Sequence, residues 1–260
     1  MPRALVTALR TLTILPVAGR EADDVAEALR WFPVVGLLLG LLLWGVASGV
    51  DALTPGGWSG GAAVAVVVAY ALLTRGFHLD GLADWADGFW GGWDREGTLR
   101  IMKDSRTGAF GVVAVVCALL ARWVAVTRLI ESGGLLWLLA AAVTARAMAV
   151  ELAVWLPYAR PEGGTGGVFV NDARLSHYLW SVGSAWLILC ATLGPVGPVA
   201  LGLGWLVVRL YGVWCRRRVG GVTGDLLGAG TEIVETTVLL VAAALASMAA
   251  PVTGWSAFVG

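Results

Sequence analysis

Hydrophobic residues in this chain come in long blocks separated by short polar segments. A helix that crosses a hydrocarbon core needs about 20 mostly apolar residues. Seven stretches reach or approach that length: 33–50, 60–74, 109–127, 134–156, 178–194, 196–214 and 236–254. Residues 4–15 are apolar but too short to span, and Arg10 gives them one polar side, which predicts an interfacial helix. The pattern therefore predicts an all-α, polytopic membrane helix bundle, with about seven transmembrane helices plus an N-terminal interfacial helix, in a single integral membrane domain over residues 1–260.

The composition supports the same class. Of the 260 residues, 58% are hydrophobic and 14% are charged, and the mean hydropathy is +0.80. A soluble domain carries about 25% charged residues, so this chain has too few charges to cover a soluble surface. The net charge of zero argues against a nucleic-acid binder, which would be basic. The three cysteines are far apart and indicate neither a disulfide framework nor a zinc site.

Basic residues predict the orientation, because loops rich in Lys and Arg stay in the cytoplasm. With the N-terminus inside, the inner segments are 1–32, 75–108, 157–177 and 215–235, and they hold fourteen basic residues, whereas the outer loops hold Arg128 alone. This asymmetry predicts a cytoplasmic N-terminus and an external C-terminus. The polar residues outside the spans are concentrated in the inner loops, so we expect the active site to face the cytoplasm.

Three carboxylates stand out in the second inner segment. Asp80, Asp84 and Asp87 are spaced i, i+4 and i+7, which places them on one face of a helix. Like charges at this spacing repel, and a divalent cation would remove the conflict; hard oxygen ligands suit Mg²⁺. The alternative is a merely solvated acidic face, which the interleaved apolar residues such as Leu79 and Trp85 disfavour. We take the three aspartates as candidate catalytic and metal-binding residues.

Polar neighbours of the triplet extend the candidate site. His78 precedes it by two residues and is either a metal-binding, proton-carrying or substrate-binding group, or a histidine that orients the loop. Further along, Lys103, Asp104, Ser105 and Arg106 combine two cations with a carboxylate and a hydroxyl, and the spacing of three residues predicts that Lys103 and Arg106 are neighbours on a helix. This run predicts a phosphate clamp, with Asp104 counted among the catalytic residues; the alternative is plain anchoring of the following span by positive charge.

The two remaining inner loops add weaker candidates. The loop after residue 219 contains Thr223, which is placed to cap the helix that follows, and Gly224; both can present backbone N–H groups to a phosphate at that helix start. Asp225 and Glu232, seven residues apart, are predicted to share one helix face and to contribute to the metal site. The loop at 157–177 contains Arg160 among glycines and is a candidate to close over a phosphate-bearing substrate.

The motifs that carry these residues resemble those of a known family. FHLDGLADWADG, DRE, IMKDSRTGAFG and GGVTGDLLGAGTEIVE, together with LTILP, RWFPVVGLLLG and YARPEG, are similar to the cobalamin synthase family, the adenosylcobinamide-GDP ribazoletransferases. The resemblance covers nearly the whole chain. Trp85, Gly97 and Thr107 depart from the family pattern, but none of them replaces a charged residue of a motif.

The resemblance implies a Mg²⁺-dependent enzyme of the bacterial plasma (inner) membrane. Such an enzyme joins adenosylcobinamide-GDP to α-ribazole or its 5′-phosphate, and it yields adenosylcobalamin or its 5′-phosphate and GMP. The partners implied are these small molecules and the lipid bilayer, with no nucleic acid. A homo-oligomer, or an association with other cobalamin-assembly enzymes, stays open; Gly36 and Gly40 would allow close helix contacts.

Two other functions match part of the sequence pattern. A CDP-alcohol phosphotransferase also uses aspartates on a membrane helix, but its D-G-x-x-A-R pattern is not matched by Asp84-Trp85-Ala86-Asp87. A cation-coupled transporter would place charges near the membrane midplane, and Arg122, Arg146, Arg209 and Glu151 do lie within predicted spans. Transporters commonly show inverted repeats, and no repeat is evident here.

Overall fold

The structure is a computed structural model that describes residues 1–54, 56–160 and 162–246. The described residues form helices and a single isolated β-bridge between Tyr158 and Val222, which confirms the predicted all-α class. The elements are α1 (Arg3–Leu12), the 3₁₀ helix η1 (Val25–Trp31), α2 (Phe32–Leu53), α3 (Ser59–Leu73), α4 (Phe77–Gly91), α5 (Arg95–Ile101), α6 (Ala109–Glu131), α7 (Leu136–Trp155), α8 (Gly167–Val170), α9 (Leu175–Leu193), the 3₁₀ turn η2 (Gly194–Val196), α10 (Gly197–Val219) and α11 (Gly224–Ala244).

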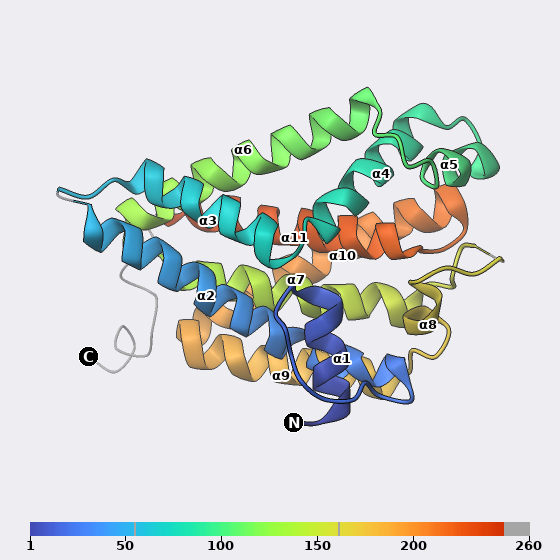
Figure 1. The fold of residues 1–260 in the computed structure, drawn as a ribbon, viewed down its shortest axis with the longest axis horizontal. Coiled ribbons are helices and arrows are strands. Elements are labelled where there is room, and N and C mark those ends of the chain that lie inside the picture. The colour runs from blue at the N-terminus through green and yellow to red at the C-terminus, as the bar shows by residue number, and fades with distance from the viewer. Residues whose placement is uncertain (55, 161, 247–260) are drawn as a thin grey trace.

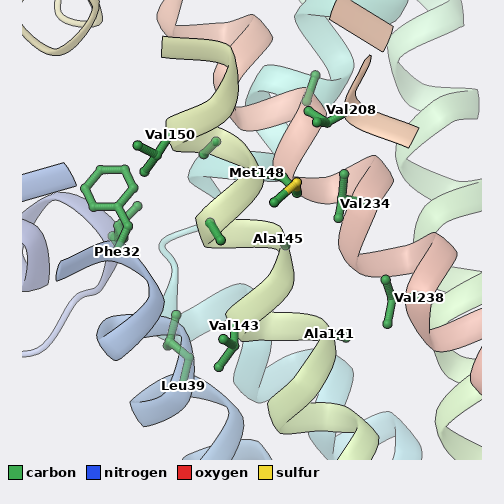
Figure 2. Close-up of a cluster of buried hydrophobic side chains, with 14 of the residues drawn as sticks. Phe32, Leu39, Ala141, Val143, Ala145, Met148, Val150, Val208, Val234 and Val238 are labelled. Atoms are coloured by element: carbon green, nitrogen blue, oxygen red, sulfur yellow. The ribbon is translucent and has the colours of Figure 1, made fainter. Parts of the chain in front are cut away.

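Helix α7 is the centre of the bundle. It contacts α2, α9, α10 and α11, and 94% of its most apolar stretch is buried inside the protein. Small residues such as Ala141 and Ala145 let its neighbours approach, while Met148 and Val143 fill the gaps between helices (Figure 2). The long helices run roughly side by side, with α4 and α5 at one end of the bundle (Figure 1).

Two glycines set the contact between α2 and α7. A Cβ at Gly36 would lie 2.6 Å from the carbonyl oxygen of Ala142, and one at Gly40 would lie 2.5 Å from the Cα of Leu139. Both positions therefore require glycine, because the two backbones touch there. The Gly36-x-x-x-Gly40 pattern is used within the chain, so it is no longer a reason to expect an oligomer.

The sequence count of seven membrane spans is not confirmed. Among the described residues, five helical segments are long and apolar enough to cross a membrane, or six if the bent pair α3 and α4 forms one span. One of the five, Leu175–Val219, contains both α9 and α10, which turn at Gly194 and pack against each other. Exposed apolar side chains such as Val116 and Leu120 on α6 and Leu187 on α9 give these helices the outer surface of a membrane protein.

The last span begins earlier than predicted. The sequence placed it at 236–254, whereas α11 begins at Gly224, and residues 247–254 lie outside the described part of the chain. The sequence placed residues 215–235 on the cytoplasmic side of this span, with Glu232 on a helix face there, and so it kept both Glu232 and Glu235 out of the span. Both carboxylates are buried and paired with arginines inside the bundle, and this pairing allows the helix to include them.

A sharp break separates α3 from α4. The two helices are bent by 86°, and the break contains two consecutive residues in the left-handed region, Arg75 at φ +55° and Gly76 at φ +65°. Glycine adopts this conformation freely, but an arginine there is strained. The bend directs α4 away from the line of α3 and across the start of α11, where the functional residues lie.

Candidate active site

The crossing of α4 and α11 brings together carboxylates that are far apart in the sequence. A Cβ at Gly81 would lie 2.5 Å from the backbone oxygen of Asp225, so glycine is needed for the helices to approach this closely. Asp80 and Asp84 on α4 thereby come near Asp225 in the first turn of α11. We call Asp80, Asp84 and Asp225 the acidic group.

The segment after α7 reaches the same place. Ala159 donates a backbone hydrogen bond to Val222, and Val222 donates one to Pro157, both at 2.9 Å. This short pairing positions Arg160, whose guanidinium donates to Asp225 Oδ2 at 2.9 Å. The loop that was predicted to close over a substrate thus places the Arg160 guanidinium directly against the acidic group.

The acidic group has an excess of negative charge. Burial, and then the nearby Asp225 and Asp80 carboxylates, raise the pKa of Asp84 to about 7, although Arg160 opposes the shift. Burial and Asp225 also raise the pKa of Asp80. Carboxylates crowded in this way favour either a shared proton or a bound cation.

The donor chemistry of the acidic group fits a hard cation, but the side chains do not form a closed cage. Within the described residues, no three His, Cys, Asp or Glu side chains are placed to hold a metal ion together. Mg²⁺ usually takes only one or two protein carboxylates and completes its shell with water and substrate phosphates. The geometry therefore matches an open site that needs a substrate, and not a preformed structural site.

Asp87 has a different role from the one predicted. It lies on the same helix face but is buried, and its two carboxylate oxygens accept hydrogen bonds from Gly108 N at 2.6 Å and Gly111 N at 2.9 Å. These amides begin α6, so Asp87 caps that helix at its positive end. The two glycines are required, because a Cβ at either position would lie 2.5 Å from an Asp87 oxygen.

Glu232 also lies away from the acidic group. Its Oε1 accepts from Arg122 at 2.7 Å and its Oε2 accepts from the Tyr70 hydroxyl at 2.5 Å. The prediction that Glu232 binds the metal with Asp225 is therefore wrong in its geometry: seven residues of helix place Glu232 two turns deeper, among buried cations.

These contacts belong to a wider set that we call the buried charge network. Glu235 pairs with Arg122 at 2.6 Å and with Arg146, and the Arg122 guanidinium lies 3.7 Å from the centre of the Tyr70 ring. The members come from four helices, α3, α6, α7 and α11: Tyr70, Arg122, Arg146, Glu232 and Glu235. The two arginines and the two glutamates balance each other's charge. Arg122 and Arg146 therefore no longer favour a cation-coupled transporter.

The predicted phosphate clamp lies in a loop and not on a helix. Helix α5 ends at Ile101 and α6 begins at Ala109, so Lys103 and Arg106 are not neighbours on a helix face as their spacing suggested. Asp104 accepts hydrogen bonds from both the backbone and the guanidinium of Arg106. These hydrogen bonds lower the pKa of Asp104 to about 2. Lys103, Ser105 and Arg106 are exposed, and their contact with a substrate stays a prediction.

Two cavities flank the start of α4. The first cavity, of about 300 Å³, lies between α1, the start of α2, α8 and α11, and His78 and Gly224 line it. The second cavity, of about 550 Å³, lies between α4 and α6 and includes Asp80 and Thr107. Thr223 does not line either of them; its hydroxyl accepts from Leu226 N and caps α11, as its position in the sequence indicated.

His78 is buried beside the network. Its Nδ1 lies 3.5 Å from a guanidinium nitrogen of Arg146. Burial and that guanidinium lower the pKa of His78 to about 3, so the imidazole is neutral. Of the two roles that the sequence left open, the structure supports an orienting histidine that also faces the first cavity.

Sequence reasoning missed Arg75. This residue has strained backbone at the break between α3 and α4, its guanidinium donates to the Arg10 carbonyl at 2.9 Å, and it lines both cavities. Strained residues held by their surroundings are common at functional sites. The available signal was its place at the end of an apolar run, directly before Gly76 and the histidine-aspartate motif.

Comparison with known proteins identifies the family. A family model described as Cobalamin-5-phosphate synthase matches residues 4–243. The chain belongs to this family. It is 45% identical over 239 residues to a protein of Chlorobium phaeobacteroides, covering 91% of this chain and 95% of that one, and 46% identical over 250 residues to a protein of Chlorobium chlorochromatii, covering 94% and 96%. Both relatives are named adenosylcobinamide-GDP ribazoletransferase. No solved structure matches this chain.

The family match includes every element of the site. Residues 4–243 contain the acidic group, both cavities and the buried charge network of this cobalamin-5-phosphate synthase family member. The resemblance seen in the sequence motifs is thereby confirmed over most of the chain.

Proposed function

We propose that this protein is an adenosylcobinamide-GDP ribazoletransferase. The observation that carries the proposal is the family membership over residues 4–243, with relatives of that name at 45–46% identity. The site agrees with the chemistry: Asp225 pairs with Arg160, Asp80 lines the second cavity, and Gly224, next to Asp225, lines the first. The bundle that holds them has the outer surface of a membrane protein. Phosphoryl transfer depends mostly on positioning and charge neutralisation, and such a site can supply both.

In the proposed reaction, a hydroxyl of α-ribazole or of its 5′-phosphate attacks the phosphorus on the cobinamide side of the pyrophosphate. A new P–O bond forms, the bond to the GMP oxygen breaks, and the hydroxyl proton is lost. Arg160 holds Asp225 and adds positive charge near the phosphates. Asp87 fixes the start of α6, and thereby the loop that carries Lys103 and Arg106.

We further propose that Mg²⁺ binds at the acidic group, through Asp80, Asp84 and Asp225. When bound, the cation would neutralise charge on the pyrophosphate and on the leaving GMP. The raised pKa of Asp84 agrees with this assignment: burial is its main cause, and the crowded carboxylates of Asp225 and Asp80, whose repulsion a cation would relieve, add to it.

A direct assay tests the reaction and the metal together. The purified full-length protein in detergent, given adenosylcobinamide-GDP with α-ribazole or its 5′-phosphate, should release GMP and form the joined corrinoid, both measured by chromatography. Treatment with a chelator should stop the release and added Mg²⁺ should restore it. Absence of GMP with either acceptor would refute the transferase, whereas full activity after chelation would refute only the metal.

We propose the plasma (inner) membrane as the location, with the N-terminus and the active site in the cytoplasm and the C-terminus outside. Cys215 is fully buried and will not report topology by labelling. Introduced cysteines at exposed positions are better probes: Arg217→Cys should label only from the cytoplasm, and Ala52→Cys should label in intact cells. Labelling of Arg217→Cys from outside would reverse the orientation.

A further inference from the structure

The first cavity is walled by apolar side chains and contains no carboxylate. Its volume is about 300 Å³, and Leu12, Leu29, Phe32, Ala149 and Phe169 form much of its surface. The Phe32 and Phe169 rings lie 6.0 Å apart at an interplanar angle of 56°. None of the described residues that line it is acidic. A cavity of this kind favours a planar, uncharged ring and disfavours a cation.

The cavity also opens close to the acidic group. Gly224, which lines it, directly precedes Asp225, and Phe77, which lines both cavities, lies one turn before Asp80 on α4. A ligand whose ring occupies the first cavity can therefore extend a polar end to the carboxylates. Arg75 adds a cation to this boundary, because it too lines both cavities.

The volumes of the two cavities indicate which substrate of the proposed reaction each can hold. Small-molecule sites measure roughly 300 to 1,000 Å³, so a cavity of about 300 Å³ suits a nucleoside with a bicyclic base. A corrinoid is far larger than this cavity. The second cavity, at about 550 Å³, contains Asp80 and is more open to accept the phosphate-bearing substrate.

We propose that the first cavity is the acceptor site, in which the apolar benzimidazole base of α-ribazole packs against Phe32 and Phe169 while its ribose points to the acidic group. This inference rests on the proposed transferase function, and it assigns one cavity to one substrate. The polar groups in this mainly apolar wall come from His78, Arg75 and three threonines, Thr11, Thr165 and Thr231.

Two variants reduce the cavity from different sides. In Ala149→Leu, a larger side chain on α7 points into the cavity, and the open volume there can accommodate it. Thr165→Phe adds a ring at an exposed rim position, where folding tolerates change better. Val168→Phe is the matched control, because Val168 is exposed in the same segment but does not line the cavity.

Steady-state kinetics with the full-length protein should separate the substrates. We expect Ala149→Leu and Thr165→Phe to raise the KM for α-ribazole roughly tenfold or more, since one misplaced methylene or larger group in an apolar pocket has an effect of that size. The KM for adenosylcobinamide-GDP should stay unchanged, and Val168→Phe should behave like the unaltered protein. A rise in the KM for the GDP substrate alone, or no change in either KM, would overturn the assignment.

Equilibrium dialysis with α-ribazole distinguishes a failed cavity assignment from a failed function. If the unaltered protein releases no GMP, the transferase proposal falls, but the cavity is still judged by binding. The site is supported if the unaltered protein and Val168→Phe bind α-ribazole, whereas Ala149→Leu or Thr165→Phe does not. Binding that is absent, or that survives both blocking variants, overturns it.

Discussion

Asp84→Asn is expected to lower the rate of GMP release by about a hundredfold or more, because it removes one of the carboxylates proposed to hold the Mg²⁺ that neutralises the phosphates. Asparagine keeps the shape of the side chain, and Asp84 is not engaged in any of the hydrogen bonds that hold the helices together in the described residues. The variant should therefore accumulate in the membrane and unfold at the same temperature as the unaltered protein. The measurement is the rate per molecule of purified protein, compared at saturating Mg²⁺.

Asp94→Asn is the matched control for this variant. Asp94 begins α5, where its carboxylate accepts a hydrogen bond from Gly97 N at 2.6 Å. Asparagine caps a helix about as well as aspartate does, so activity should stay close to that of the unaltered protein. An Asp84→Asn protein that kept most of its activity would show that the acidic group is not the reaction centre.

Arg122→Met is expected to destabilise the folded protein by about 3–5 kcal/mol, because removing one partner of a buried ion pair leaves the others uncompensated. The Arg122 and Glu232 side chains are 1% exposed, and Arg122 is the only arginine within hydrogen-bond distance of Glu232 among the described residues. A drop in the thermal unfolding temperature in detergent, or loss of the protein from the membrane fraction, measures the effect.

The control for Arg122 is a surface ion pair. Arg3 and Asp23 are 2.9 Å apart but their side chains are 52% and 93% exposed. Exposed pairs contribute about 0 to 1 kcal/mol, so Arg3→Gln should leave the unfolding temperature nearly unchanged. If Arg122→Met unfolded no earlier than Arg3→Gln, the buried charge network would not hold the bundle together.

The buried charge network also explains why the start of α11 was predicted too late in the sequence. A count of apolar residues treats each charge as a cost to a span, which is correct for an unpaired charge. Glu235 is paired with arginines of α6 and α7, at sequence separations of 113 and 89 residues. No local pattern reports such a partner, and so the predicted span began twelve residues too late.

Within the acidic face of α4, the helical period was predicted correctly, but the role of Asp87 was not. All three aspartates lie on the helix expected from their spacing. The first is exposed, the second is half-buried and the third is buried. Asp87 is used to cap α6 because the chain returns there after α5, with two glycines at the contact. Asp225, 141 residues after Asp84, occupies the neighbouring position at the crossing with α11.

Properties that depend on neighbouring residues could be predicted from the sequence: the helical membrane class, the polar face of α4, the Thr223 cap and the family motifs. These follow from helix period, apolar length and side-chain type, which act over a few residues. The folded arrangement was needed to show which carboxylates meet, which arginines neutralise the buried glutamates and where the cavities open. Those features depend on how helices cross, and the crossings are set by close backbone contacts such as Gly81 against Asp225, between residues far apart in the chain.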